Sequence, residues 1–313
     1  MLFLKSVNTH KSSPADIGTH FTILSGEIIL YHPLRRLIRF EAYGILFMLA
    51  GLFGALLTNA SFDWSLAVLL IFIAASSAFG FVINDISDVT LDARLEKTRN
   101  PLADGSLSCR VAWIISGIFL AISLACMAIL PSSLFTIELA VLFVFFTYSF
   151  IIEAKNIAGL DLVYHALFPA LYGLMGYVLS HPFDLTGLVF TILLGIFGAI
   201  GEMGNEIRDH EKDRHVRNNT VVFMGERLSF ILTLGLMLSA FVIITFFAVI
   251  QPGYFWLIPI VPFGIFLVHP VYQAMKIPDF RETFVDTINS RAIILAVVML
   301  LVYTIIRFFG VIR

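Results

Sequence analysis

The chain has 313 residues, of which 59% are hydrophobic and 13% charged, and its mean hydropathy is +0.93. Soluble domains are nearer half apolar and a quarter charged, so this composition predicts a protein that faces lipid. The formal net charge of −2 leaves no basic excess with which to bind a nucleic acid. The two cysteines are too few for a disulfide framework and lack metal-ligand spacing.

The first 37 residues are expected to form a polar N-terminal segment that ends in an interfacial helix. Residues 1–20 are mixed and polar, without a secretory signal pattern. Residues 21–31 are apolar but too few to cross a membrane, and Pro33 with three arginines follows them. This pattern predicts a helix that lies in the membrane interface. Residues 38–313 are then expected to form one transmembrane bundle.

Nine apolar segments follow, and each is predicted to be a helix that crosses a hydrocarbon core of about 30 Å. Backbone groups in lipid must be satisfied within the segment, and the segments do not alternate in polarity as barrel strands do. The predicted spans are 42–57, 64–83, 111–130, 134–152, 160–179, 185–203, 228–250, 254–275 and 293–312.

The basic residues predict the orientation of this bundle. If the N-terminus is cytoplasmic, 18 of the 20 Lys and Arg residues lie in cytoplasmic segments, and the other two are Arg307 and Arg313. The outer turns at 131–133, 181–183 and 251–253 contain none. This asymmetry follows the positive-inside rule. It predicts a multi-pass protein of the cell membrane with an external C-terminus.

Two acidic runs are predicted to lie in long cytoplasmic loops, and they share one register, offset by 121 residues. Each has Asn, an acid at +1, Asp at +4 and Asp at +8, a spacing that brings the four positions together on one side of a helix. The runs are Asn84, Asp85, Asp88 and Asp92, and then Asn205, Glu206, Asp209 and Asp213. The repeat indicates two related halves that each contribute an acidic helix end.

Like charges on one helix face repel, so such a cluster requires a compensating cation. Loosely spaced oxygen ligands suit Mg²⁺, which also binds substrate phosphates. All eight residues of the two runs except Asn205 are therefore predicted metal ligands, and Asp85, Asp88, Asp92, Asp209 and Asp213 are expected to be catalytic. Two facing clusters would hold a diphosphate through bridging metals. Neighbouring basic residues are either further diphosphate contacts or positive-inside anchors: Arg94, Lys97, Arg99, Arg208 and Lys212.

These motifs resemble those of the UbiA superfamily of intramembrane prenyltransferases. That family has N-D-x-x-D-x-x-x-D after its second helix, which Asn84 to Asp92 match in full. It has D-x-x-D-x-E-x-D after its sixth helix, where Glu206 replaces the first Asp. The segment Pro101-Leu102-Ala103-x-Gly105 is similar to the family's R-P-L-x-x-G, with Asn100 in place of Arg.

Two further features compare with the same family. Arg217 stands at a position that is commonly Gly. Tyr148-Ser149 and Lys155 are similar to a Tyr-Ser…Lys segment at the end of the fourth helix, although the spacing to the lysine is longer. The resemblance therefore adds Tyr148 and Lys155 to the expected diphosphate contacts.

The resemblance implies a helical bundle whose cavity opens sideways to lipid. A prenyl diphosphate would be held by Mg²⁺, or by Mn²⁺ in its place, and ionise to an allylic cation that a lipophilic acceptor captures. Acceptors in the family include aromatic acids or quinone precursors, geranylgeranylglycerol phosphate, carotenoid ends and porphyrins, and the sequence selects none of them. Prenyl chain length and oligomeric state are equally open.

Two alternatives remain at this stage. A terpene cyclase of the same family would use the same metal site without an acceptor. A secondary transporter would also have matching halves and intramembrane polar residues. Its broken helices would be marked by His165 with Pro169, or by His269-Pro270, although kinks and core histidines explain these residues as well. Phosphatidyl-type transferases usually have a D-G-x-x-A-R pattern, which this sequence lacks.

Overall fold

The computed structural model describes residues 23–24, 27–28, 33–97, 99–251, 260–277 and 280–308. The chain divides into two compact units, residues 1–32 and 33–313. In the first unit, the strands β1 (Ile23–Leu24) and β2 (Glu27–Ile28) pair antiparallel. The helix predicted over 21–31 is therefore wrong at these four residues, and the rest of it lies outside the described residues. Isoleucine favours a strand, and Gly26 between the two strands disfavours a helix.

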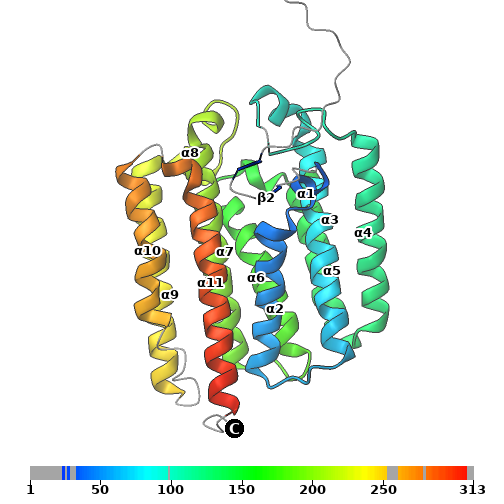
Figure 1. Ribbon diagram of the computed structural model, residues 1–313, viewed down its shortest axis with the longest axis vertical. Coiled ribbons are helices and arrows are strands. Elements are labelled where there is room, and N and C mark those ends of the chain that lie inside the picture. The colour runs from blue at the N-terminus through cyan, green and yellow to red at the C-terminus, as the bar shows by residue number, and fades with distance from the viewer. Residues whose placement is uncertain are drawn as a thin grey trace, which may run out of the picture. The chain divides into compact units, whose positions relative to one another are not determined.

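The second unit is helical throughout its regular structure, as the predicted bundle requires (Figure 1). Each predicted span overlaps one of the longer described helices: α2 (Ile45–Leu57), α3 (Trp64–Arg94), α4 (Cys109–Ile129), α5 (Phe135–Phe146), α6 (Leu160–Val178), α7 (Leu185–Asp213), α9 (Glu226–Ile250), α10 (Ile260–Lys276) and α11 (Arg281–Phe308). Two short helices, α1 (Pro33–Ile38) and α8 (Thr220–Met224), lie outside the predicted spans. The predicted parts 254–259 and 309–312 lie outside the described residues.

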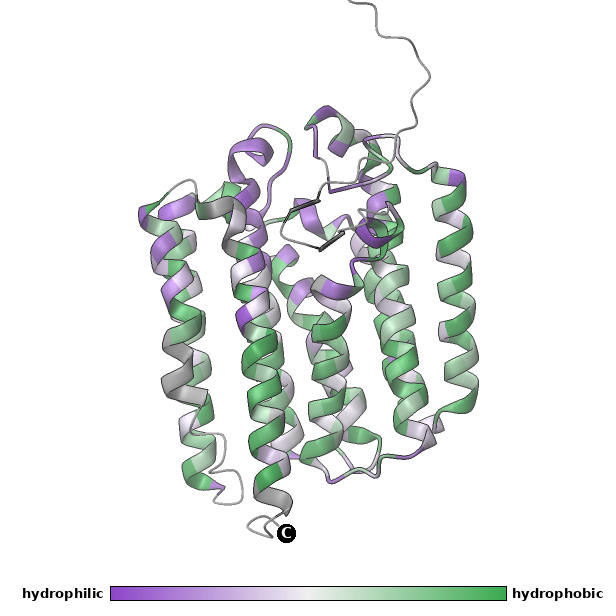
Figure 2. Cartoon of the chain, viewed as in Figure 1, coloured by the Kyte–Doolittle hydropathy of each residue, from purple (hydrophilic) through white to green (hydrophobic). Residues whose placement is uncertain are grey.

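Length and hydropathy identify this unit as a multi-pass membrane bundle. Among the described residues, six helical segments are long and apolar enough to cross a bilayer, and α2 is a shorter apolar helix. Large apolar side chains such as Trp113, Phe143 and Phe246 are more than half exposed, at 51%, 62% and 66%. A surface of this kind fits lipid rather than water. Figure 2 shows hydrophobic residues along most of each long helix and hydrophilic residues gathered at one end of the bundle.

The helices α3 and α7 are longer than the spans predicted for them. Each begins at an aspartate cap: Asp63 accepts hydrogen bonds from the backbone N–H groups of Ser65 and Leu66, and Asp184 accepts one from Gly187. Each then continues about three turns beyond its apolar part, to Arg94 and to Asp213. The placement of the acidic runs in loops is therefore wrong: both runs are the last turns of helices, which gives their side chains a fixed spacing.

Helices α2 and α6 approach closely because glycines line their contact. A Cβ atom added to Gly176 would lie 1.8 Å from the backbone oxygen of Gly51, and one added to Gly54 would lie 2.1 Å from that of Gly173. Small residues permit such backbone contact in membrane helices. The contact places the segment before α2 beside His165 of α6.

The helices that contain internal prolines are continuous. Helix α6 runs through Pro169 and α10 runs through Pro270 without a break. The broken helices that would favour a transporter are therefore not found at His165 or His269.

Candidate active site

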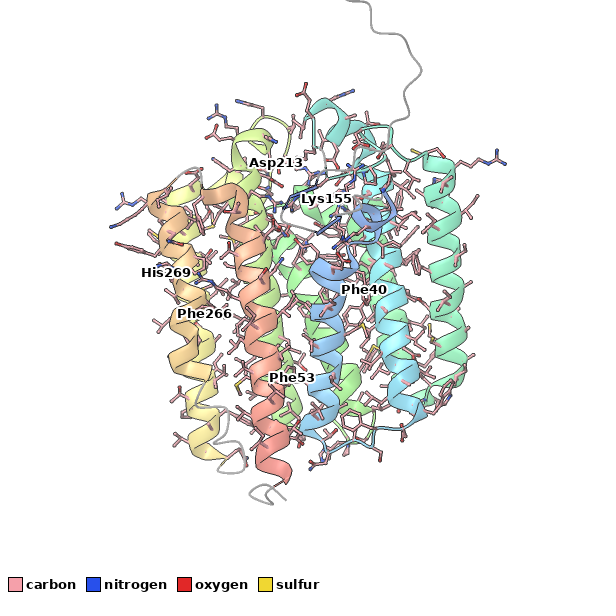
Figure 3. All side chains as sticks on the ribbon, in the orientation of Figure 1. Phe40, Phe53, Lys155, Asp213, Phe266 and His269 are labelled. Carbon is pink, nitrogen blue, oxygen red and sulfur yellow. The ribbon has the colours of Figure 1, made fainter. Side chains whose placement is uncertain are left out.

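A polar cavity of about 420 Å³ lies at the hydrophilic end of the bundle, between the acidic ends of α3 and α7. Figure 3 shows Lys155 and Asp213 at this end, whereas Phe53 of α2 lies farther along the bundle. The charged and amide residues that line the cavity are Arg39, Asn84, Asp88, Asp92, Lys97, Arg99, Asn100, Lys155, Glu202, Asn205, Arg208, Asp209, Lys212 and Arg217.

The three aspartates of α3 are buried, and each is paired with a polar partner. Asp88 forms an ion pair with Lys155, with Oδ1 and Nζ 2.7 Å apart. Asp92 accepts a hydrogen bond from the side-chain amide of Asn100 at 3.0 Å. Asp85 is fully buried and pairs with Arg39. Burial alone would lower the pKa of Arg39, but the carboxylate of Asp85 raises it. Each carboxylate thus lies beside a fixed donor.

Lys155 reaches this cluster from a tight turn after α5. A π-helical turn, Thr147–Ile151, ends the helix, and a 3₁₀ turn, Ala154–Asn156, carries the lysine. Its Nζ also donates hydrogen bonds to Ser87 Oγ at 2.7 Å and to Asn84 Oδ1 at 3.3 Å. Burial lowers the pKa of Lys155, and the carboxylate of Asp88 opposes this effect.

On α7, the side chains that face the cavity are Glu202, Asn205, Asp209 and Lys212 together with Arg208. Asp209 is held by Arg208 through two contacts of 2.9 Å. Glu202 Oε2 lies 3.0 Å from His165 Nε2 and accepts a hydrogen bond from Asn205 at 3.1 Å. Glu206 does not line the cavity, because its Oε2 accepts a hydrogen bond from the backbone N–H of Val221 at 3.0 Å.

Two basic residues connect the two acidic ends in opposite directions. Lys97 follows α3 and pairs with Asp213 of α7, with Nζ and Oδ1 2.8 Å apart. Arg217 follows α7 and pairs with Asp88 of α3, with Nη2 and Oδ2 3.1 Å apart. Burial opposes the charge of Arg217, but the carboxylates around it, Asp88 first, raise its pKa. The two halves are therefore joined by reciprocal ion pairs.

The structure brings most of the predicted site residues together. Ten of them line the cavity: Asn84, Asp88, Asp92, Lys97, Arg99, Tyr148, Lys155, Arg208, Asp209 and Lys212. Asp85, Glu206 and Asp213 are buried next to it without lining it, and the exposed Arg94 does not line it either.

Twelve lining residues were outside the predicted set, among them Arg39, Tyr43, His165, Glu202 and Arg217. Glu202 carried a usable signal, because a carboxylate inside an otherwise apolar span is costly and marks a functional position. Of the three arginines near α1, Arg35 pairs with Glu41 and Arg36 with Asp104, so Arg39 is the one that reaches the cavity.

An apolar cavity of about 320 Å³ adjoins the polar one and extends between α2, α6, α7, α9, α10 and α11. Its lining includes Leu46, Phe53, Leu193, Phe241 and Met299. Six residues line both cavities and mark their junction: Tyr43, Phe47, His165, Phe168, Glu202 and Asn205. A charged chamber that continues into an apolar one suits an amphiphilic ligand.

The oxygen donors of the polar cavity fit a magnesium ion. Asp88 and Asp92 from one helix and Asp209 from the other supply carboxylates, and Asn84 supplies an amide oxygen. Hard oxygen ligands of this kind, few in number and open to a phosphate, are those that Mg²⁺ uses. Among the described residues, a further group of His210, Glu211 and Glu226 lies close together outside the cavity.

Comparison with known proteins agrees with this geometry. The model of the UbiA prenyltransferase family matches residues 45–284. A UbiA homologue from Archaeoglobus fulgidus, solved with GPP and Mg²⁺, is similar in structure with a TM-score of 0.68 at 20% identity, covering 85% of this chain and 99% of that one. The apo UbiA homologue from Aeropyrum pernix K1 has a TM-score of 0.68 at 18% identity, covering 83% and 97%.

A digeranylgeranylglyceryl phosphate synthase is similar with a TM-score of 0.61 at 17% identity, covering 87% of this chain and 96% of that one. No curated protein matches the sequence. The family model spans more than three quarters of the chain, and both acidic helix ends lie within the matched residues. The chain belongs to the UbiA prenyltransferase family and is a prenyltransferase of the membrane.

Proposed function

We propose that the protein is a Mg²⁺-dependent intramembrane prenyltransferase that moves an isoprenoid group from a prenyl diphosphate to a lipophilic acceptor. The observation that carries this proposal is the junction of the two cavities. The diphosphate binds among the carboxylates and cations of the polar cavity, and the prenyl chain lies in the apolar cavity. The carbon that bears the diphosphate then lies near Phe47 and Phe168, which line both.

The reaction breaks the bond between this carbon and the diphosphate oxygen, and the electron pair leaves with the diphosphate. Lys155 is buried and Arg217 is half-buried; both face the cavity and can bind the departing oxygens. Magnesium, held at the side of the cavity that Asp92 and Asp209 form, would neutralise further charge on the leaving group. Related structures with GPP or DMAPP and Mg²⁺ support this assignment. We expect Mn²⁺ to replace Mg²⁺.

The allylic cation is captured by a nucleophilic atom of the acceptor, which forms the new bond and releases a proton. Phe47 and Phe168 present aromatic rings at the junction, and ring faces stabilise cations. Glu202 and His165 are hydrogen-bonded to one another at the same place, so this pair is positioned to receive the proton. Water is kept from the cation by the apolar walls on the membrane side.

The bundle is proposed to cross the membrane nine times, with its N-terminus and polar cavity on the cytoplasmic side. The positive-inside count supports this orientation. Cys109 tests it, because it is exposed at the start of α4, on the side predicted to be cytoplasmic, whereas Cys126 is buried. A membrane-impermeant maleimide should label Cys109 in inside-out vesicles and not in right-side-out vesicles. The reverse labelling would contradict the orientation.

The deciding experiment incubates purified protein with radiolabelled geranylgeranyl diphosphate and Mg²⁺, with and without a panel of acceptors. Diphosphate release that requires one acceptor, and that Asp88→Asn or excess EDTA abolishes, supports the transferase. Release without an acceptor, together with a cyclic hydrocarbon or alcohol product, would replace it with a cyclase. No release with any donor length, in folded protein, would reject both.

A further inference from the structure

The guanidinium of Arg217 lies between the two acidic helix ends. Its Nη2 is 3.1 Å from Asp88 Oδ2 and 4.0 Å from Asp92 Oδ1, both on α3. Its Nε is 4.0 Å from Asp213 Oδ1 on α7. The side chain is 12% exposed and lines the polar cavity. A single charged group thus contacts carboxylates of both clusters, which is the position that a bridging cation would take.

The backbone on both sides of Arg217 is fixed. Its own N–H donates to the carbonyl oxygen of Asp213 at 2.9 Å, at the end of α7. Three residues later, the N–H of Thr220 donates to Asp161 at 2.6 Å, and Asn219 caps α8 through the N–H of Val222 at 2.9 Å. These short anchors limit how far the guanidinium can withdraw from the carboxylates.

Asp88 has protein cations at both of its oxygens. Lys155 lies 2.7 Å from Oδ1 and Arg217 lies 3.1 Å from Oδ2. A metal ion that bridged Asp88 to the α7 cluster would have to displace one of these side chains or share its oxygen. The bidentate, always charged guanidinium is a strong competitor for that place.

The charge balance of the cavity points the same way. Seven basic side chains line it, against four carboxylates that line it and three, Asp85, Asp213 and Asp286, that pair directly with its lining residues. The basic side chains, Arg217 among them, therefore already balance these carboxylates, and a divalent ion is left to balance the diphosphate.

We propose that Arg217 takes the place of one of the metal ions between the acidic helix ends, so that this protein binds prenyl diphosphate with a single divalent ion. The proposal rests on the proposed function, because it concerns the same diphosphate site. It assigns the remaining ion to the side of the cavity formed by Asp92 and Asp209, away from the oxygens of Asp88 that Lys155 and Arg217 occupy.

The test counts bound ions rather than turnovers. Purified full-length protein is titrated with Mn²⁺ in the presence of a saturating prenyl thiolodiphosphate, an analogue that ionises poorly, and free Mn²⁺ is measured by electron paramagnetic resonance. The wild-type chain should bind one Mn²⁺, and Arg217→Gln should bind two. Removal of a cation some 4 Å from the carboxylates should also lower the Mn²⁺ concentration at half-saturation by about tenfold.

Arg214→Gln is the matched control, because Arg214 is in the same segment but is 49% exposed and pairs with Glu211 outside the cavity. It should bind one Mn²⁺ with wild-type affinity. Two ions in the wild-type chain overturn the proposal, and so does a single ion of unchanged affinity in Arg217→Gln. If thermal denaturation shows that Arg217→Gln is unfolded, Arg217→Met replaces it, and the wild-type count still decides.

The same titration separates this proposal from the proposed function. Two Mn²⁺ ions in a wild-type protein that transfers prenyl groups would reject the role of Arg217 and leave the transferase intact. No binding of Mn²⁺ or of the analogue would reject both.

Discussion

The acidic ends of α3 and α7 repeat one sequence register, and the structure uses three of the four positions in the same way. The first position lines the polar cavity in both, as Asn84 and Asn205, and so does the third, as Asp88 and Asp209. The second position, Asp85 or Glu206, is buried in both without lining the cavity. The fourth position differs, because Asp92 lines the cavity and Asp213 does not.

The common pattern follows from helical geometry. Positions one and three are four residues apart and lie on one face, whereas position two is turned by about 100° from position one. Its carboxylate is directed into the protein and supports the cavity wall. Asp85 pairs with Arg39, and Glu206 accepts the backbone N–H of Val221. The repeat thus encodes one substrate-facing and one supporting set of acids in each half.

The largest effects are expected from the two aspartates at the third position of the repeat, Asp88 and Asp209. Asp88→Asn and Asp209→Asn should each lower the rate of prenyl transfer by about a thousandfold, because each removes charge that binds metal or orients Lys155, Arg217 or Arg208. Radiolabelled transfer in folded protein measures this. The control is Asp286→Asn, because the side chain of Asp286 on α11 is 67% exposed. Its rate of prenyl transfer should stay near that of the wild type. Near wild-type activity in one of the pair would show that the two ends are not equivalent.

The supporting acids should instead affect stability. Asp85→Asn leaves Arg39 without its buried partner and should cost about 3 kcal/mol of unfolding free energy. Glu206→Met leaves the N–H of Val221 unpaired and should cost about 2 kcal/mol. Thermal denaturation in detergent detects both losses, and Glu211→Gln, 66% exposed, should change stability by less than about 0.5 kcal/mol. Unchanged stability together with lost Mn²⁺ binding would make these acids metal ligands.

The arrangement of the helices and the location of the site could be predicted because both depend on local patterns. Apolar length predicted a helix in each of nine segments, and six described helices are long and apolar enough to cross a membrane. The repeated acidic register predicted the helix ends that line the polar cavity. Glu202 was missed because it lies a turn before the repeated motif, inside the predicted span 185–203. Its partner His165 comes from another helix, and that pairing depends on tertiary packing rather than on spacing.

The role of individual basic residues could not be predicted for the same reason. Lys97 and Arg217 each pair with a carboxylate of the opposite acidic run, and proximity in sequence does not reveal such a contact. Arg39 follows α1 in a left-handed conformation (φ 51°), from which its side chain reaches Asp85. No periodic pattern in the sequence records such a turn. The strands at residues 23–28 were likewise hidden within a short apolar segment.

The reciprocal ion pairs give a smaller expected effect. Lys97→Met removes a cavity cation and the partner of Asp213, so the KM for prenyl diphosphate should rise by about tenfold while kcat changes less. Lys97→Arg keeps the charge and should recover most of the affinity. Steady-state kinetics with varied donor concentration measure the difference. A fall in kcat at unchanged KM would show that Lys97 stabilises the transition state and not the bound donor.

The smallest effect should come from Arg94, three residues before Lys97. Arg94 ends α3, is exposed and does not line the polar cavity, so Arg94→Ala should change the KM for donor by less than about twofold. A basic residue in the last turn of a helix does stabilise it, and its removal should cost about 0.5 kcal/mol. Measured beside Lys97→Met, this variant separates a positive-inside anchor from a substrate contact. If Arg94→Ala raised the KM as much as Lys97→Met, the general positive charge at this end of α3, rather than the position of Lys97 opposite Asp213, would bind the diphosphate.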